Sequence, residues 1–205
     1  AVHREGIRTV SKADIAAAEG LGYRIKLLGI ADACGERVRV RVHPSLLPVD
    51  HPLAKVDGVY NALFLHGDFV GDLMFSGRGA GSDPTASAVV GDLIDVARNK
   101  AVSGPGSALP YGQDMPTEPI DTLKTAYYLR IRVQDRPRVL GRIATVLGDH
   151  DVSLEAMEMR TVDEGSGEIV FLTHPCRESD FRSALEDLDR QGAVESIAAH
   201  FRVEA

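Results

Sequence analysis

The sequence predicts an α/β (α+β) fold in two parts: a mixed or antiparallel sheet with helices, then a smaller β-α-β-β-α-β domain. Strand and helix periodicities follow that second order through residues 127–205. Before them, residues 100–126 hold four prolines among glycine, serine and polar residues, without regular periodicity. A chain of 205 residues has room for two modest domains. We therefore expect a first domain over 1–105, a linker over 106–126 and a second domain over 127–205.

The first helix is predicted from a capping box. Ser11 is followed three residues later by Asp14, and Gly20 and Gly22 mark the end of the helix. Residues 23–32 then have the composition and spacing of a strand.

A second strand, over 36–44, alternates strictly between arginine and valine. Arg37, Arg39 and Arg41 share one face, and valines occupy the other. The expected role of this arginine stripe is a solvated face of a two-sided sheet, and contact with an acidic partner is the alternative.

A second helix follows a predicted hairpin. Two strands, over 58–67 and 69–77, are expected to join around His66, Gly67 and Asp68. Asp83 then fits a helix cap and Pro84 the first helical position. Apolar residues at helical spacing extend this helix to about Asn99, at positions 86, 89, 90, 93, 94 and 97.

The tail has the clearest pattern. Four strands and two helices are predicted there, the strands over 127–133, 152–160, 168–174 and 194–204, and the helices over 137–149 and 178–190. Residues 163–168 supply the turn between the two central strands. This order makes a four-stranded antiparallel sheet with two helices on one side.

Three glycines, Gly77, Gly79 and Gly81, precede the second helix. Their G-x-G-x-G spacing differs from the dinucleotide fingerprint G-x-G-x-x-G, and no parallel strand follows the helix, so this is not a Rossmann turn. One interpretation is a turn where backbone packs closely. The other is a secondary wall for a cofactor held mainly by another domain, with an anionic group favoured at the helix N-terminus.

The loop around residues 133–140 is the other candidate site, because a strand-to-helix loop offers free amide hydrogens to a carboxylate. A plain turn with Pro137 at the helix start is the alternative. Scattered histidines and two unrelated cysteines predict no metal site and two free buried thiols. A net charge of −7 argues against general binding of nucleic acid or a membrane surface, and no apolar run reaches the length of a membrane span.

Long stretches of the chain resemble, in order, the C-terminal half of bacterial homoserine dehydrogenase. They are EGIRTVSKADIAAAEGLGYRIKLLGIA, VRVHPSLLPVDHPLAKVDGVYNALFLHGD, GRGAGSDPTASAVVGDLIDVA and YYLRIRVQDRPRVLGRIATVL. The resemblance implies that residues 1–105 end a catalytic and dimerisation region. It also implies that residues 127–205 form an ACT domain, a ferredoxin-like βαββαβ module that senses small molecules.

The family interconverts homoserine and aspartate semialdehyde with NAD(P), in threonine and methionine synthesis. The resemblance implies that Gly77, Gly79 and Gly81 lie beside the nicotinamide, while the main dinucleotide domain and the catalytic residues lie upstream. We therefore expect no catalytic residue in this chain, no activity from it alone, a cytoplasmic homodimer or homotetramer, and a choice between NAD and NADP made elsewhere. The alternative is a free-standing ACT regulatory protein without catalysis.

The ACT resemblance has one departure. Typical modules read D-x-P-G-V-L, whereas Arg138 replaces the glycine here. By resemblance, Asp135, Arg136 and Ser153 are the candidate ligand residues, and the ligand would be an amino acid such as threonine. The alternative role of the module is the pairing of subunits.

Overall fold

The computed structural model describes residues 2–101, 114–163 and 165–204. It divides into two compact units. Unit 1 contains residues 1–49 and 115–205, and unit 2 contains residues 50–114. Each unit is described separately below.

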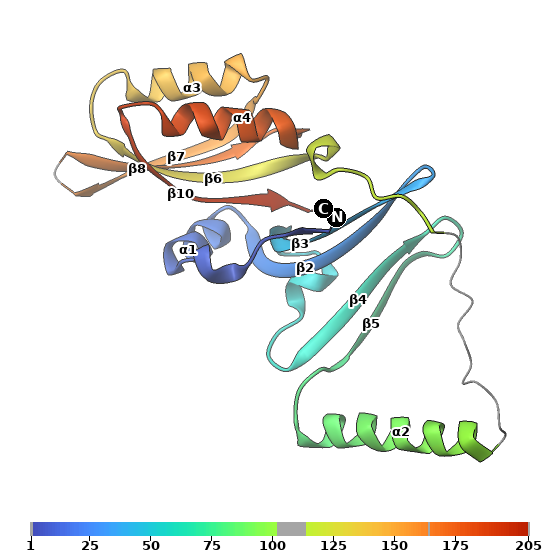
Figure 1. Ribbon diagram of the computed structural model, residues 1–205. Coiled ribbons are helices and arrows are strands. Elements are labelled where there is room, and N and C mark those ends of the chain that lie inside the picture. The colour runs from blue at the N-terminus through green and yellow to red at the C-terminus, as the bar shows by residue number, and fades with distance from the viewer. Residues whose placement is uncertain (1, 102–113, 164, 205) are drawn as a thin grey trace. The chain divides into compact units, whose positions relative to one another are not determined.

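The tail of unit 1 has the predicted β-α-β-β-α-β order. Its elements are β6 (Lys124–Gln134), α3 (Val139–Asp149), β7 (Leu154–Asp163), β8 (Ser166–Thr173), α4 (Glu178–Asp189) and β10 (Val194–Val203). The strands pair antiparallel in the order β10-β6-β8-β7. A two-residue strand, β9 (Cys176–Arg177), also pairs with β6. Helices α3 and α4 lie together on one face of this sheet (Figure 1).

The helix periodicities correctly identified the core of the tail. Val139, Ile143 and Leu147 of α3 are buried, and Phe181 of α4 stacks on Tyr127 of β6 with ring centroids 3.9 Å apart. Burying such a side chain contributes roughly 1.5–3 kcal/mol. Two helix faces and one sheet face therefore close a single hydrophobic core.

The N-terminal residues continue the same sheet. They form β1 (His3–Arg4), η1 (Ile7–Thr9), α1 (Lys12–Gly20), β2 (Tyr23–Cys34) and β3 (Arg37–Pro48). β3 pairs antiparallel with β2 along its length and parallel with β1 and β10, which completes an eight-stranded sheet. The predicted capping box of α1 is present, and Gly22 adopts a φ of +83° after the helix.

Helix α1 covers the sheet face opposite α3 and α4. Its Ala17 and Ala18 pack with Leu46 of β3, Tyr128 of β6 and Phe201 of β10. The central strands of the tail are therefore buried on both faces, which explains the nearly continuous apolar character of residues 127–133.

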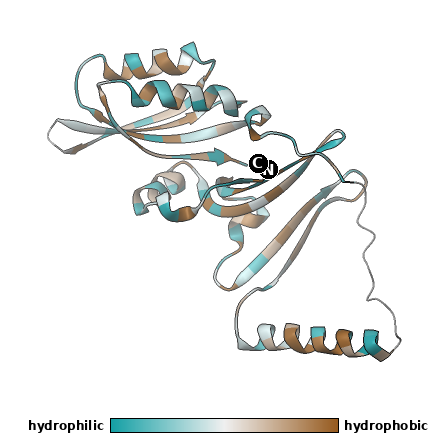
Figure 2. Ribbon diagram, viewed as in Figure 1, coloured by the Kyte–Doolittle hydropathy of each residue, from teal (hydrophilic) through white to brown (hydrophobic). Residues whose placement is uncertain are grey.

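Unit 2 holds the predicted hairpin and helix. Its elements are η2 (Pro52–Lys55), β4 (Tyr60–Gly67), β5 (Gly71–Arg78) and α2 (Ser82–Ala101), and β4 and β5 pair antiparallel. The helix begins one residue before the predicted cap, so Asp83 lies in its first turn. Figure 2 shows hydrophobic residues along α2 and the hairpin, and many of them are exposed, including Leu63, Phe75 and Leu93.

The compact units divide the chain differently from the expected segments 1–105, 106–126 and 127–205. Residues 1–49 pack with the tail because β3 joins its sheet. Of the expected linker, residues 106–113 lie outside the described residues. Its described part pairs with β3, since the Val38 amide donates to the Pro116 carbonyl at 3.1 Å and the Glu118 amide to the Val38 carbonyl at 2.9 Å. η3 (Ile120–Thr122) follows.

Among the helices described, none combines the length and the apolar character needed to cross a membrane.

Candidate functional site

The glycine loop of unit 2 connects β5 to α2. Gly77 is on β5, where it pairs with Asn61 of β4. The Gly79 amide donates to the Val59 carbonyl at 2.9 Å, which ties the loop to the start of the hairpin. Gly81 has a φ of +128°, a conformation that residues with a side chain rarely adopt.

The three loop positions differ in what a side chain would meet there. A β-carbon on Gly79 would lie 1.9 Å from Asn61 Nδ2, so any other residue there would displace the Asn61 side chain from its present position. A β-carbon on Gly77 would meet no atom within 4 Å. Nothing in unit 2 therefore excludes a side chain at Gly77, and the surface beside it is open.

The surface beside Gly77 is accessible to a group from outside unit 2. Gly77 leaves space for a flat ring to approach the backbone. The N-terminus of the 20-residue helix α2 favours negative charge, but Asp83 already supplies a carboxylate in its first turn. The carboxylate already present at the start of α2 thus disfavours a phosphate beside this loop.

The loop between β6 and α3 differs from expectation. The Asp135 amide donates to the Gly165 carbonyl at 2.9 Å and the Arg136 amide to the Gln134 carbonyl at 2.9 Å. Pro137 has no amide hydrogen and lies before the helix, which begins at Val139. The expectation of freely available amides is therefore wrong for Asp135 and Arg136. Both side chains are exposed.

The backbone conformation of Arg138 explains why the typical motif has glycine at this position. It is the N-terminal cap of α3 and has a φ of +75°. Glycine adopts this left-handed conformation without strain, whereas a residue with a β-carbon has a steric cost there.

The structure does not bring Asp135 and Ser153 together within one chain. The Asp135 amide donates to the carbonyl of Gly165, beyond the end of β7. Ser153 precedes the start of β7, and its carbonyl accepts a hydrogen bond from the His174 amide at 2.8 Å. The 10 residues of β7 separate the two positions, about 30 Å at 3.3 Å per residue. A ligand could contact both residues only if they came from different subunits.

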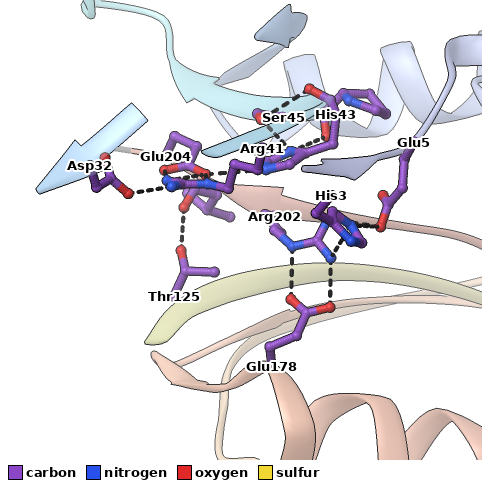
Figure 3. Close-up of polar contacts among 12 residues, drawn as sticks. His3, Glu5, Asp32, Arg41, His43, Ser45, Thr125, Glu178, Arg202 and Glu204 are labelled. Carbon is purple, nitrogen blue, oxygen red and sulfur yellow. Dashed lines mark hydrogen bonds and ion pairs between the residues drawn. The ribbon is translucent and has the colours of Figure 1, made fainter. Parts of the chain in front are cut away.

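A buried ion cluster joins the N-terminal residues to the tail (Figure 3). Arg202 of β10 is 2% exposed and donates to both carboxylate oxygens of Glu178, at 2.6 and 2.8 Å. It also donates to Glu5 at 3.0 Å. The Tyr127 hydroxyl donates to Glu178 at 2.7 Å. Burial by itself would raise the pKa of Glu178, but the Arg202 and Tyr127 hydrogen bonds and the Arg202 charge outweigh it and lower that pKa to about 2.

The arginine stripe runs from an exposed end at Arg37 to a buried end at Arg41. Arg41 is buried, forms ion pairs with Asp32 of β2 and with Glu204, and makes three hydrogen bonds to Glu204 (Figure 3). Arg37 pairs with Glu118 at 3.0 Å, and Arg39 donates to the Thr122 hydroxyl at 3.0 Å. The expected solvated face is therefore wrong for Arg41, because the chain itself supplies acceptors from distant segments, whereas Arg37 is exposed as expected.

His43 lies within the same region and is fully buried. Its Nδ1 lies 2.9 Å from the Ser45 hydroxyl, and its Nε2 lies 3.6 Å from Glu204, too far for a hydrogen bond. Burial and the charges of Arg202 and Arg41 lower the pKa of His43 to about 4, so the ring is neutral at pH 7.

A second buried pair connects α1 to β6. Arg130 Nε donates to Asp14 at 2.6 Å, and its other nitrogens donate to Glu168 and Ser11. Burial would raise the pKa of Asp14, yet the hydrogen bonds from Arg130 and Ser11 lower it below its ordinary value. Asp14 of the capping box is thus also the ion-pair partner of Arg130, which lies far away in the sequence.

Sequence reasoning missed Asn61 and the ion clusters. Nothing local marks Arg202 or Glu178 as buried partners, and nothing local marks Asn61 as a neighbour of the glycine loop. Cys34 and Cys176 are both free, with Cys176 buried and Cys34 half-buried. Within the described part of the chain, no group of histidine, cysteine and carboxylate side chains could hold a metal ion.

Comparisons with known proteins show which proteins this chain resembles. A family model described as homoserine dehydrogenase matches residues 1–94, and one described as ACT domain matches residues 127–193. A homoserine dehydrogenase of Synechocystis is 44% identical over 97% of this chain, and one of Neisseria gonorrhoeae is 39% identical over 100% of it. The chain spans 48% and 49% of these two relatives, about half of their length.

Solved structures give the same result. A homoserine dehydrogenase from Thiobacillus denitrificans matches 99% of this chain with a TM-score of 0.83 and 40% identity, and the match covers 47% of that protein. One from Staphylococcus aureus matches with a TM-score of 0.62 and 30% identity. By sequence and by fold, the chain is similar to the C-terminal half of homoserine dehydrogenases, and its residues 127–193 match an ACT domain.

Proposed function

We propose that this chain is the C-terminal half of an NAD(P)-dependent homoserine dehydrogenase, which interconverts homoserine and aspartate semialdehyde. The observation that carries the proposal is the collinear match of nearly the whole chain to proteins of that name. When bound, the dinucleotide accepts or supplies the hydride. We assign no catalytic residue to this chain and expect it to be inactive by itself.

In this proposal, the glycine loop forms a secondary wall of the nicotinamide site. Gly77 leaves the backbone open to a flat ring, and Gly79 permits the close contact with Asn61 that shapes the loop. Gly81 turns the chain into α2 with its positive φ. The contribution of these residues is to position the ring and exclude water beside it.

The test uses the full-length polypeptide that carries this sequence. Activity is assayed with homoserine and each dinucleotide, which also decides between NAD and NADP. Gly77→Leu should raise the KM for the dinucleotide about tenfold or more, since the new side chain occupies the open space. Gly79 is a poor test site, because any substitution there also displaces Asn61.

Ser76→Leu is the matched control, because neighbouring strand residues point to opposite faces. It should leave the dinucleotide KM unchanged. Unchanged cofactor kinetics in Gly77→Leu would refute the wall. A full-length polypeptide that does not oxidise homoserine would refute the activity and favour the free-standing regulatory protein.

We propose that the ACT domain binds an amino acid such as threonine or pairs subunits in a homodimer or homotetramer. Because Asp135 and Ser153 are about 30 Å apart along β7, a ligand site using both would have to lie between subunits. Exposed apolar side chains on β4 and β5, such as Leu63 and Phe75, support assembly with further protein surface. Two unpaired thiols support a cytoplasmic location.

Calorimetry with threonine tests the regulatory role. Heat of binding that disappears in Asp135→Ala and in Ser153→Ala supports a site shared between subunits. Absence of heat at millimolar threonine leaves only the pairing role, which sedimentation measures independently.

A further inference from the structure

Asn61 occupies the position from which it can hold the glycine loop. It pairs with Gly77 across the β4–β5 hairpin. Its carboxamide fills the volume that a side chain on Gly79 would take, since a β-carbon there would lie 1.9 Å from Nδ2, 2.4 Å from Cγ and 2.9 Å from Oδ1. One side chain of β4 thus contacts the residue that follows β5.

The polar groups of this carboxamide are free. Asn61 is exposed, and it makes no hydrogen bond to any residue in the described ranges. The loop itself is fixed by a different bond, from the Gly79 amide to the Val59 carbonyl. Filling the space over Gly79 would need only an apolar side chain of similar size, such as leucine. The donors and acceptor of this exposed carboxamide are therefore available to a ligand.

The surroundings identify the kind of group that these atoms can meet. The open space beside Gly77 adjoins Asn61, its partner in the ladder. A carboxamide offers two donors and an acceptor, and it matches amide and hydroxyl groups of a ligand. The nicotinamide ribose end of a dinucleotide carries both kinds of group. Polar groups that fix a ligand's orientation are few and lie at such positions.

We propose that the Asn61 side chain hydrogen-bonds the nicotinamide riboside portion of the bound dinucleotide, while its packing on Gly79 holds that carboxamide in place. This inference rests on the proposed function of the glycine loop. It adds a cofactor-binding residue from β4, outside the glycine stretch. It also explains why the hairpin carries a polar residue against a glycine.

The experiment measures dinucleotide affinity directly in the full-length polypeptide. The fluorescence of NADH and NADPH is titrated with wild type, Asn61→Leu, Asn61→Asp, Gly77→Leu and Asn99→Leu. Leucine keeps the volume over Gly79 and removes the hydrogen bonds, so the dissociation constant should rise about tenfold. Aspartate keeps the shape, and its charge also weakens binding of a negatively charged dinucleotide. Asn99→Leu, near the end of α2, should bind as wild type does.

Thermal unfolding of each variant shows whether the hairpin remains folded, and Asn61→Asp serves as the readout if Asn61→Leu unfolds. Wild-type affinity in a folded Asn61→Leu or Asn61→Asp would overturn the inference. If Gly77→Leu weakens binding while the Asn61 variants do not, the wall remains and only the role of Asn61 fails. If neither position affects binding, the proposed function of the loop fails as well.

Discussion

Removal of one charge from the buried cluster should destabilise unit 1 strongly. Glu178→Gln keeps the shape of the side chain but leaves Arg202, which is 2% exposed, without its bidentate carboxylate. The pKa of Glu178 falls from 4.5 to about 2 on folding, which corresponds to about 3 kcal/mol at 1.36 kcal/mol per unit. Breaking a buried pair typically costs about 3–5 kcal/mol, so the two magnitudes agree.

Urea unfolding followed by tyrosine fluorescence measures this loss. The chain has no tryptophan, and the buried Tyr127 and Tyr128 both report on unit 1. Because folding lowers the pKa of Glu178, its stabilisation is complete above about pH 4.5 and disappears as the pH falls through about 2. The difference between wild type and Glu178→Gln should therefore be about 3 kcal/mol at pH 7 and decline across that interval.

Glu186→Gln is the matched control on the same helix. Its carboxylate is 65% exposed and lies 3.9 Å from Arg190, so its loss should change stability by less than about 0.5 kcal/mol. A loss below about 1 kcal/mol in Glu178→Gln, or one that does not change in acid, would refute the account of the cluster.

Three further predictions use the same unfolding measurement or simple chemistry. Arg138→Gly should stabilise unit 1 by about 1 kcal/mol, because it relieves the left-handed φ of +75°, and an unchanged or lower stability would contradict this. Folding lowers the pKa of His43 from 6.5 to about 4, so stability should be greatest above pH 6.5 and fall by up to about 3 kcal/mol toward pH 4. His43→Gln should flatten the stability profile over that range, and a profile unchanged from wild type would exclude His43 as its cause. Burial raises the pKa of Cys176 to about 11, so iodoacetamide should label the half-buried Cys34 first in the folded chain, and equal rates in mass spectrometry would contradict the described burial.

Local patterns in the sequence predicted most elements to within a few residues. The capping box of Ser11 and Asp14, the alternation of β3 and the apolar spacing of α3 and α4 are short-range signals, and the structure confirms them. The boundaries that moved are those where pairing extends a strand, as in β6, which begins at Lys124 because β9 pairs with it there.

The candidate sites were less predictable, because they depend on how distant segments meet. The sequence identified the glycine loop, but only the hairpin register places Asn61 against Gly79. Asp135 and Ser153 were grouped by motif, whereas the strand between them holds them at opposite ends of β7. The Asp135 amide donates to the Gly165 carbonyl, which lies beyond the end of β7, whereas Ser153 precedes its start. No local spacing in the sequence predicts that hydrogen bond.

By itself, the sequence determined the order of helices and strands, the βαββαβ tail and the resemblance to one family, since periodicity, caps and motifs are properties of neighbouring residues. The tertiary structure alone decided that the arginine stripe is paired, that residues 1–49 share a sheet with the tail, and that Arg202 is buried between Glu5 and Glu178. Those contacts join residues as far apart as 197 positions, and a buried charge selects its partner by proximity in space rather than by separation along the chain.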